Sequence, residues 1–132
     1  TANHCKTTIS KNNVLRGIHG DKKSWKLVTC LQGEVFQVCV DLRTSSATYG
    51  KYYCKYLVGA DPVEILMPPG FGNAFWVKSD SCVYQYRLWY EGQYNDASEQ
   101  FTISWNDPKL NIQWPTEKPV LSERDMLHAK NL

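Results

Sequence analysis

The sequence predicts an all-β fold, a double-stranded β-helix (jelly roll) that is followed by a short C-terminal helix. Strands are indicated by short runs rich in Val, Tyr, Trp, Phe and Leu, with turn residues between them. These runs cover residues 14–19, 25–32, 34–43, 51–58, 63–67, 74–78, 82–90, 101–105 and 110–114. Eight or nine short strands in a chain of 132 residues favour a sandwich or closed barrel.

The connections between these runs are predicted from glycine, proline and helix-capping residues. Gly33 separates two runs by a single residue, which favours a tight hairpin. The segment MPPGFG at 67–72 holds two consecutive prolines, so we expect a rigid loop outside any central strand. Near the end of the sequence, Ser122 precedes ERDMLHAK and is a suitable N-cap for the predicted helix.

The composition narrows the classes of function. The chain is 42% hydrophobic with a formal net charge of +2, and its Lys and Arg residues are scattered. No basic block favours nucleic-acid binding, and no apolar run approaches the ~20 residues that a membrane span needs. We therefore expect one jelly-roll domain over residues 1–132, with neither a nucleic-acid nor a membrane partner.

The five cysteines indicate a reducing compartment. Their number is odd, no CxxC pair is present, and Cys30, Cys39 and Cys82 lie inside strand-like runs. A free cysteine at such a position behaves as a small hydrophobic residue. We therefore expect a cytoplasmic protein rather than a secreted one.

A candidate site begins in the first run, where the sequence LRGIHG places a histidine between two glycines. Side chains three residues apart in an extended strand point to opposite faces, so Arg16 and His19 should face apart. A bulge at Gly17 would reset the alternation and bring both side chains into one cavity. The alternative is a simple kink at Gly17, with His19 as a hydrogen-bonded core residue.

Three later residues are candidates for the same cavity. Lys26 lies in register with apolar neighbours two and four residues later, which places it on an inward face. Tyr86 shares a face with Tyr84 and Leu88, so at least one phenol is expected to point inward. Asp125 follows the last run and could fold back over the mouth of the barrel. The alternatives are a solvated edge lysine, a core tyrosine and an exposed loop aspartate.

Together, a histidine, a lysine, a tyrosine and an aspartate suit proton transfer beside a carbonyl group. Histidine removes protons near neutral pH, and a carboxylate holds its tautomer. A lysine stabilises the resulting oxyanion, and a tyrosine on the opposite wall returns a proton to the other face, which amounts to epimerisation.

Two other chemistries fit the sequence less well. A metal site is not expected, because His4, His19 and His128 are far apart in the sequence. Nucleophilic catalysis is not expected either, because no Ser or Cys has a histidine at a suggestive spacing.

Six blocks of the sequence resemble one known family, in the family's order and along nearly the whole chain. They are NNVLRGIHG, KLVTCLQGEVFQVCVDLR, TYGKY, PPGFGNAF, ISWNDPKLNIQWP and LSERD. The chain is therefore similar to the dTDP-4-dehydrorhamnose 3,5-epimerase family, cupin-type jelly rolls that act on nucleotide-linked 4-keto sugars. The resemblance implies a homodimer that uses neither a metal nor an organic cofactor.

The resemblance also implies a role for each candidate residue. His19 corresponds to the catalytic base and Asp125 to its carboxylate partner. Lys26 corresponds to the lysine beside the C4 oxygen of the sugar, and Tyr86 to the tyrosine acid. The residues that correspond to substrate contacts are Arg16, Asn73, Asn3, Glu99, Arg124 and Tyr94, with Tyr90 as an alternative to the last.

Departures from the family pattern favour a different sugar. Asn73 stands where the family usually has a histidine, and Gln37 stands where an aspartate is common. Gly20 replaces a larger residue after the base and is expected to leave room for another sugar. These changes resemble a branch that acts on other nucleotide sugars, including GDP-linked 4-keto heptoses. The family's N-terminal strand segment, which supplies nucleotide contacts, is also expected to be missing.

The leading hypothesis is epimerisation at C3, C5 or both of an NDP-4-keto-6-deoxy sugar or heptose, through an enolate. One alternative is a ketoisomerase that moves the ketone by the same enolisation. The other is a non-catalytic sugar-binding jelly roll, because the aromatic residues and Asn73 would also suit a lectin.

Overall fold

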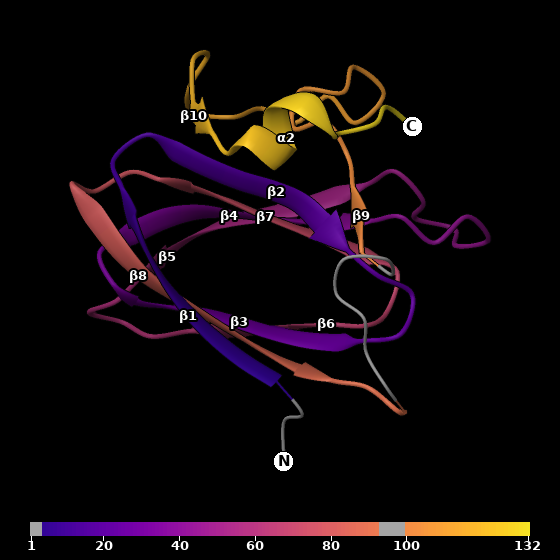
Figure 1. The fold of residues 1–132 in the computed structure, drawn as a ribbon, viewed down its shortest axis with the longest axis horizontal. Helices are drawn as coiled ribbons and strands as arrows, with labels where there is room; N and C mark the ends of the chain where they lie inside the picture. The colour runs from indigo at the N-terminus through magenta and orange to yellow at the C-terminus, as the bar shows by residue number, and fades with distance from the viewer. Residues whose placement is uncertain (1–3, 93–99) are drawn as a thin grey trace.

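The computed structural model describes residues 4–92 and 100–132, which form two facing sheets with a C-terminal segment over one of them (Figure 1). In spatial order, the four-stranded sheet consists of β1 (His4–Lys11), β8 (Ser81–Trp89), β3 (Trp25–Gln32) and β6 (Glu64–Met67). The six-stranded sheet consists of β10 (Val120–Leu121), β2 (Val14–Gly20), β7 (Phe71–Val77), β4 (Glu34–Asp41) and β5 (Tyr52–Val58), with β9 (Phe101–Thr102) also paired to β2. The expected all-β jelly roll is confirmed.

The main apolar core lies between the two sheets. Because successive side chains of a strand alternate, each long strand sends every second residue into this space. The buried residues of the core are Val28, Cys30, Val35, Cys39, Leu57, Met67, Phe75, Val77, Cys82 and Tyr84. Each fully buried Val, Leu, Phe or Met side chain contributes ~1.5–3 kcal/mol of hydrophobic stabilisation, and the core therefore holds the two sheets face to face.

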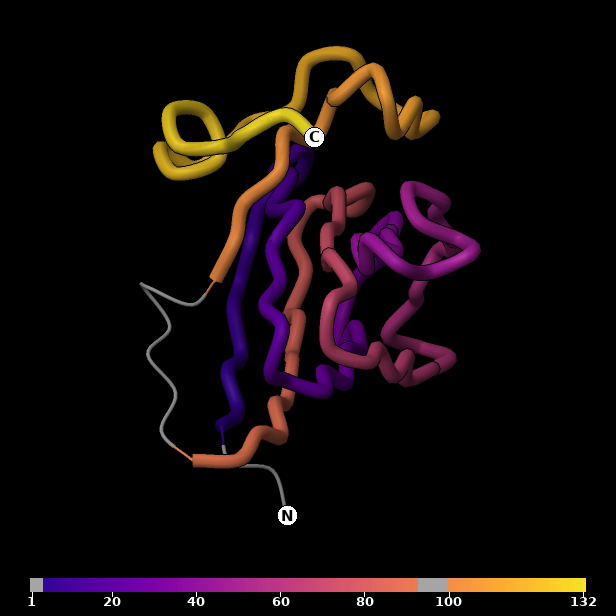
Figure 2. Tube along the Cα trace, turned by 90° about the vertical axis from the view of Figure 1, so that its right-hand side faces the viewer, coloured from indigo at the N-terminus to yellow at the C-terminus, as the bar shows by residue number. Residues whose placement is uncertain are grey.

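A second apolar cluster lies on the outer face of the six-stranded sheet. Ile18, Val38 and Ala74 belong to the sheet, while Leu110 and Trp114 pack on them from the C-terminal segment. This segment is coloured orange to yellow in Figure 1, where it lies above β2, and Figure 2 shows it from the side. The six-stranded sheet is therefore covered on both faces.

Several features differ from the sequence prediction. The run 101–105 forms a strand only at Phe101–Thr102. Residues 110–114 do not form a strand, because their apolar side chains cover the outer face of the sheet instead of pairing within it. β1 is an additional strand, which the predicted runs do not include because its sequence HCKTTISK is largely polar. Gly33 is not a hairpin turn but a corner, since β3 and β4 belong to different sheets. Its φ of +86° favours glycine, and a Cβ there would lie 2.3 Å from the carbonyl oxygen of Ser81.

The predicted C-terminal helix is confirmed. The predicted proline loop over residues 67–72 is shorter than expected, because Met67 ends β6 and Phe71 and Gly72 belong to the central strand β7. Helix α2 (Glu123–Leu127) begins after Ser122, whose Oγ accepts a hydrogen bond from the backbone N–H of Asp125 at 3.1 Å. β6 ends at Met67 and β7 begins at Phe71, so both prolines lie between strands. In the part of the chain that the structure describes, no helix has the length and hydropathy to cross a membrane.

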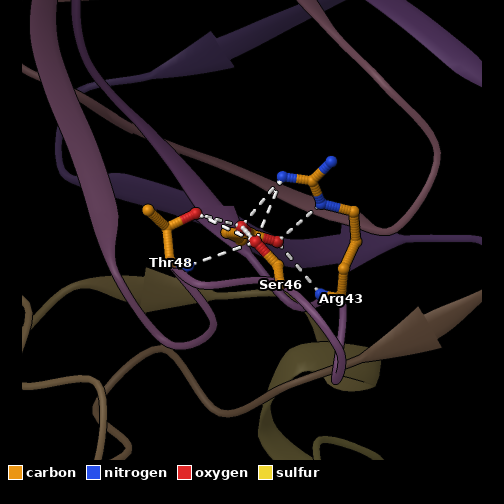
Figure 3. Close-up of polar contacts among 4 residues, drawn as sticks. Arg43, Ser46 and Thr48 are labelled. Atoms are coloured by element: carbon orange, nitrogen blue, oxygen red, sulfur yellow. Dashed lines mark hydrogen bonds and ion pairs between the residues drawn. The ribbon is translucent and has the colours of Figure 1, made fainter.

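A buried carboxylate fixes the connection between β4 and β5 (Figure 3). Asp41 accepts hydrogen bonds from Nε and Nη2 of Arg43 at 2.9 and 3.0 Å. The hydroxyl of Ser46 donates to the same carboxylate at 2.6 Å, and the hydroxyl of Thr48 donates to it as well. The hydrogen bond from Arg43 and those from the two hydroxyls outweigh burial, so the pKa of Asp41 lies well below its ordinary value of 3.8.

Candidate active site

A cavity of about 200 Å³ opens between the two sheets. Its lining residues are Lys6, Thr8, Arg16, His19, Lys26, Asn73, Phe75, Tyr84, Tyr86, Gln100, Ser122 and Arg124. They come from both sheets and from the segment around α2, so a bound molecule would be contacted from opposite sides. Four lining side chains are Lys or Arg, and none of the described lining residues is Asp or Glu. The cavity therefore favours an anionic ligand.

Strand β2 contains the predicted bulge at Gly17. Arg16 and His19 both pair with β7, but the three steps between them match only two steps on β7. Gly17 has a φ of +135°, and a Cβ at this position would lie 2.4 Å from the Cβ of Ala74, so the bulge requires glycine. The extra residue brings Arg16 and His19 to the same cavity. The alternative, a simple kink, is therefore wrong.

His19 is held by a carboxylate from a distant part of the chain. Its Nε2 lies 2.5 Å from Oδ1 of Asp125, which is 106 residues away in the sequence. Oδ2 of Asp125 accepts the backbone N–H of Gly17 at 3.2 Å, so one carboxylate fixes both the bulge and the imidazole. A carboxylate at Nε2 keeps a proton on that atom and leaves the lone pair of neutral His19 on Nδ1.

His19 is partly exposed to solvent, whereas its partner Asp125 is buried and ionised. The side chain of His19 is 23% exposed and that of Asp125 only 1%. Burial raises the pKa of Asp125, but the hydrogen bond and charge of His19 and the N–H of Gly17 outweigh it, so the pKa lies below its ordinary value. An ionised Asp125 stabilises the imidazolium that forms when His19 takes a proton.

The facing sheet presents a lysine and a tyrosine to the cavity. Lys26 on β3 is buried, and its Nζ lies 5.3 Å from the ring centroid of Tyr86 on β8. Lys26 is therefore not the solvated edge lysine of the alternative interpretation. An ammonium group on this wall can stabilise an anion, and a phenol beside it can deliver a proton from the side opposite His19.

Two arginines of the cavity are oriented by hydroxyl groups. Nε of Arg16 donates to Oγ of Ser10 at 2.9 Å, and Nε of Arg124 donates to Oγ1 of Thr102 at 2.8 Å. Each bond uses one of the five N–H donors of a guanidinium, which leaves the others for further partners. The remaining N–H groups of a guanidinium can bind two oxygens of one phosphate group at once. This part of the cavity therefore suits a diphosphate.

A neutral hydrogen-bond chain forms the wall between these groups. The hydroxyl of Tyr84 donates to Oε1 of Gln37 at 2.6 Å, and Nε2 of Gln37 donates to Oδ1 of Asn73 at 2.5 Å. The ring of Tyr84 stacks on Phe75 with the centroids 3.8 Å apart. Burial raises the pKa of Tyr84 well above its ordinary value of 10, so Tyr84 stays a neutral phenol within the wall. Tyr86 is the less buried of the two phenols.

The family of the chain follows from its similarity to known proteins. A family profile described as dTDP-4-dehydrorhamnose 3,5-epimerase matches residues 1–131. The chain belongs to this family. Among curated members, a dTDP-4-dehydrorhamnose 3,5-epimerase of Shigella flexneri is 36% identical over 127 residues, which cover 94% of this chain and 67% of that protein. A dTDP-4-dehydrorhamnose 3-epimerase of Streptomyces niveus is 37% identical over 121 residues, which cover 89% of this chain and 57% of that protein. The chain thus spans about two thirds or less of the length of these relatives.

Solved structures of epimerases share the fold of the chain. The dTDP-6-deoxy-D-glucose-3,5-epimerase of Legionella pneumophila, in complex with dTDP-4-keto-L-rhamnose, has a TM-score of 0.90 and 34% identity, with 99% of this chain and 69% of that chain covered. A 4-keto-6-deoxy sugar epimerase from Streptomyces spheroides has a TM-score of 0.88 and 34% identity, with 96% and 63% covered. The resemblance found in the six sequence blocks is confirmed.

In this member of the dTDP-4-dehydrorhamnose 3,5-epimerase family, most of the expected site residues lie at the cavity. His19, Lys26, Tyr86, Arg16, Asn73 and Arg124 line the cavity, and Asp125 contacts His19 from outside the lining. Asn3, Tyr94 and Glu99 lie outside the described residues, so their positions remain expectations. Within residues 4–92 and 100–132, no three His, Cys, Asp or Glu side chains are grouped so that they could hold a metal ion.

Gly20 does not leave the room that the sequence suggested. A Cβ at this position would lie 2.2 Å from the carbonyl oxygen of Phe71 and 2.6 Å from the ring of Phe101. The space beside Gly20 is therefore filled by β7 and β9, and this glycine allows close packing rather than a larger sugar.

β1 contributes to the cavity although its sequence did not predict a strand. Lys6 and Thr8 line it, because every second residue of the strand faces inward. The inward face of β1 is polar, so the strand lacks the buried apolar alternation that marks a strand in a sequence. In this epimerase family member, the polar inward face of β1 belongs to the site.

Proposed function

We propose that the protein is an epimerase of nucleotide-linked 4-keto sugars that acts at C3, C5 or both. One observation carries the proposal: the His19–Asp125 pair lies on one wall of a cationic cavity, and Lys26 and Tyr86 lie on the opposite wall. Membership of the dTDP-4-dehydrorhamnose 3,5-epimerase family supports the same reaction.

In the proposed reaction, His19 removes the proton from a carbon next to the C4 ketone. The electron pair of the broken C–H bond forms a C=C bond, and the carbonyl π pair moves to the oxygen as an enolate. Lys26 stabilises this negative charge, and Tyr86 then protonates the opposite face of the carbon. The proton on His19 leaves to solvent and Tyr86 regains one from solvent, so the enzyme is unchanged. General acid–base steps of this kind contribute ~10²–10⁴-fold each.

The proposed substrate has a diphosphate that contacts the cationic residues. Arg16 and Arg124 keep guanidinium donors for phosphate oxygens, and Lys6 adds a third positive charge. Asn73 is proposed to contact the sugar, while Asn3, Glu99 and Tyr94 are proposed as substrate contacts on the family resemblance alone. The neutral residues at Asn73 and Gln37 support a sugar other than that of the typical family member, such as a GDP-linked heptose.

A homodimer in the cytoplasm is the proposed state. Ile9, Trp25 and Leu66 are exposed on the outer face of the four-stranded sheet, which supports a second copy as the cover of this face. The five cysteines are free thiols, which supports a reducing compartment. Sedimentation at several concentrations tests the dimer, and a monomer at micromolar concentration would contradict it.

Hydrogen exchange tests the function. The protein is incubated in deuterated water with dTDP-, GDP- and CDP-linked 4-keto sugars, and NMR monitors C3 and C5. We expect deuterium and inverted configuration at one or both carbons. His19→Ala should abolish exchange, whereas His128→Ala, a histidine that does not line the cavity, should retain it. A ketone that moves to another carbon would indicate the isomerase, and binding without exchange would indicate a lectin.

A further inference from the structure

The backbone carbonyl of Val38 determines the orientation of the Gln37 amide. A carbonyl only accepts hydrogen bonds, and it lies 3.1 Å from one end of the Gln37 amide, which must therefore be Nε2. The other end, Oε1, accepts the hydroxyl of Tyr84 at 2.6 Å. Gln37 is 0% exposed, so water cannot replace either partner. The amide has one orientation that satisfies both ends.

The orientation of Gln37 then determines that of Asn73. Nε2 of Gln37 lies 2.5 Å from the nearer end of the Asn73 amide, and two amide nitrogens cannot hydrogen-bond to each other. Asn73 must therefore turn Oδ1 toward Gln37, where the hydroxyl of Tyr84 also lies 3.2 Å away. Nδ2 is left at the far end of a side chain that lines the cavity, and no described residue accepts a hydrogen bond from it.

This nitrogen lies next to the proposed base. Asn73 is the direct partner of His19 across the β2–β7 pair, and side chains of such partners share one face of the sheet. Lys26 reaches the same cavity from the opposite sheet. A carbonyl oxygen beside the carbon that His19 deprotonates would therefore have a neutral donor on one side and an ammonium on the other.

We propose that Nδ2 of Asn73 donates a hydrogen bond to the sugar oxygen that becomes negative in the enolate, and that Gln37 is a positioning residue that keeps this nitrogen toward the cavity. The inference rests on the proposed function, which it deepens. Because the hydrogen bond strengthens as charge moves to the oxygen, it lowers the barrier more than it tightens ground-state binding. Because an amide does not titrate, this donor works equally well at every pH at which the fold is stable.

Asn73→Asp tests the donor. The carboxylate has nearly the same shape, but it replaces an N–H donor by a negative charge facing the enolate. At neutral pH we expect kcat to fall ~10²–10³-fold with KM changed by less than about threefold, because one oxyanion donor is lost. The deficit relative to wild type should shrink as the pH falls, because a protonated Asp at position 73 again donates a hydrogen bond.

Asn111→Asp is the matched control for this change, since Asn111 is exposed and lies outside the cavity. It should keep wild-type kcat at all pH values. A loss of less than about threefold in Asn73→Asp, or a loss that does not depend on pH, would overturn the donor role.

Gln37→Glu tests the positioning. An ionised carboxylate at position 37 only accepts, so Asn73 should turn Nδ2 toward it and present Oδ1 to the cavity. We expect kcat to fall ~10-fold or more. Gln113→Glu is the matched control, because Nε2 of Gln113 makes the same contact with Oδ1 of Asn111, at 3.1 Å, on an exposed loop. An unchanged kcat in correctly folded Gln37→Glu would overturn the positioning role.

NMR of the wild-type side-chain amides tests the orientation without catalysis. The Gln37 amide protons are in hydrogen bonds within the wall and should exchange slowly with water, whereas the Asn73 amide protons face the cavity and should exchange quickly. Slow exchange at Asn73 would overturn the inference even if the enzyme is active. Failure of wild type to exchange deuterium into any sugar would instead overturn the proposed function, and the donor role with it.

Discussion

Ser122 caps helix α2 by accepting the backbone N–H of Asp125 at 3.1 Å, and the carboxylate of the same Asp125 lies 2.5 Å from Nε2 of His19. The helix is only five residues long, and such a helix is not stable without its cap and its packing. The capping bond therefore also positions the carboxylate that orients the proposed base.

Ser122→Ala should weaken both the fold and the reaction. Loss of an N-cap costs ~1 kcal/mol of unfolding free energy, and a looser Asp125 should lower kcat severalfold. Urea unfolding and the deuterium-exchange assay measure the two effects. Ser122→Thr keeps a capping oxygen and should restore most of both, whereas equal kcat in all three proteins would disconnect the cap from the site.

Asp125→Asn should affect the reaction much more than binding. An amide at this position can donate to Nε2 of His19, which moves the ring proton to Nδ1 and removes the lone pair from the proposed base. The corresponding change in a serine-protease triad lowers kcat ~10⁴-fold, and we expect a loss of up to that order. Calorimetric binding of a nucleoside diphosphate should stay within a few-fold of wild type. A variant with near-normal exchange would show that Asp125 is not needed for proton removal.

Gly17→Ala should strongly destabilise the protein. The φ of +135° is unfavourable for alanine, and the added Cβ would lie 2.4 Å from the Cβ of Ala74. Strain and overpacking together should cost ~3 kcal/mol or more. Gly50→Ala is a suitable comparison, because Gly50 also has a positive φ but has open space around it, and it should cost only ~1–2 kcal/mol. Equal costs in thermal unfolding would contradict the role of the close contact with β7.

Tyr84→Phe should lower the free energy of unfolding while leaving the shape of the cavity wall unchanged. The ring would remain stacked on Phe75, but Oε1 of Gln37 would lose its donor in a site that water does not reach. A buried acceptor without a partner costs ~1–3 kcal/mol, which chemical denaturation can measure. Wild-type stability in this variant would mean that Oε1 finds another donor.

Acid should weaken the β4–β5 connection through Asp41. Its pKa is lower in the folded than in the unfolded protein, so the ionised carboxylate stabilises the fold at pH values above the ordinary pKa of 3.8. This stabilisation should decline as the pH falls below about 4. In Asp41→Asn, unfolding free energy should be lower at pH 7 and should fall less steeply below pH 4 than in wild type. Parallel pH profiles of the two proteins would contradict this assignment.

The strands that could be predicted from the sequence are those rich in apolar and aromatic residues and bounded by turn residues. This composition located β2, β3, β4 and β8 to within two residues. Alternation within these runs placed Lys26 and Tyr86 on inward faces. β1 was not predicted as a strand because its inward face, which lines the cavity, is polar. Residues 110–114 were wrongly predicted as a strand, because an apolar segment that packs on the face of a sheet has the same composition as a strand within the sheet.

The site was predictable only in part, because its central contact joins distant parts of the chain. The glycine beside Arg16 indicated a bulge, but nothing local to Asp125 indicates that it meets His19. That meeting depends on β10, which pairs in parallel with β2 just before the helix, and on its register of Leu121 with Leu15. Only the family resemblance indicated that Asp125 is the carboxylate partner of His19, because the spacing of the two residues in the sequence does not show it.

Because the C-terminal segment returns to pair with β2, the molecule can become active only after this late part of the chain has docked. Both sheets and the cavity between them consist almost entirely of residues before 103, whereas the carboxylate that orients His19 comes from residue 125. A polypeptide that has emerged from the ribosome only as far as residue 115 could pair most of its strands, yet its imidazole would lack a partner. Catalytic competence would then arise as a late event of biosynthesis, when the last strand and helix dock.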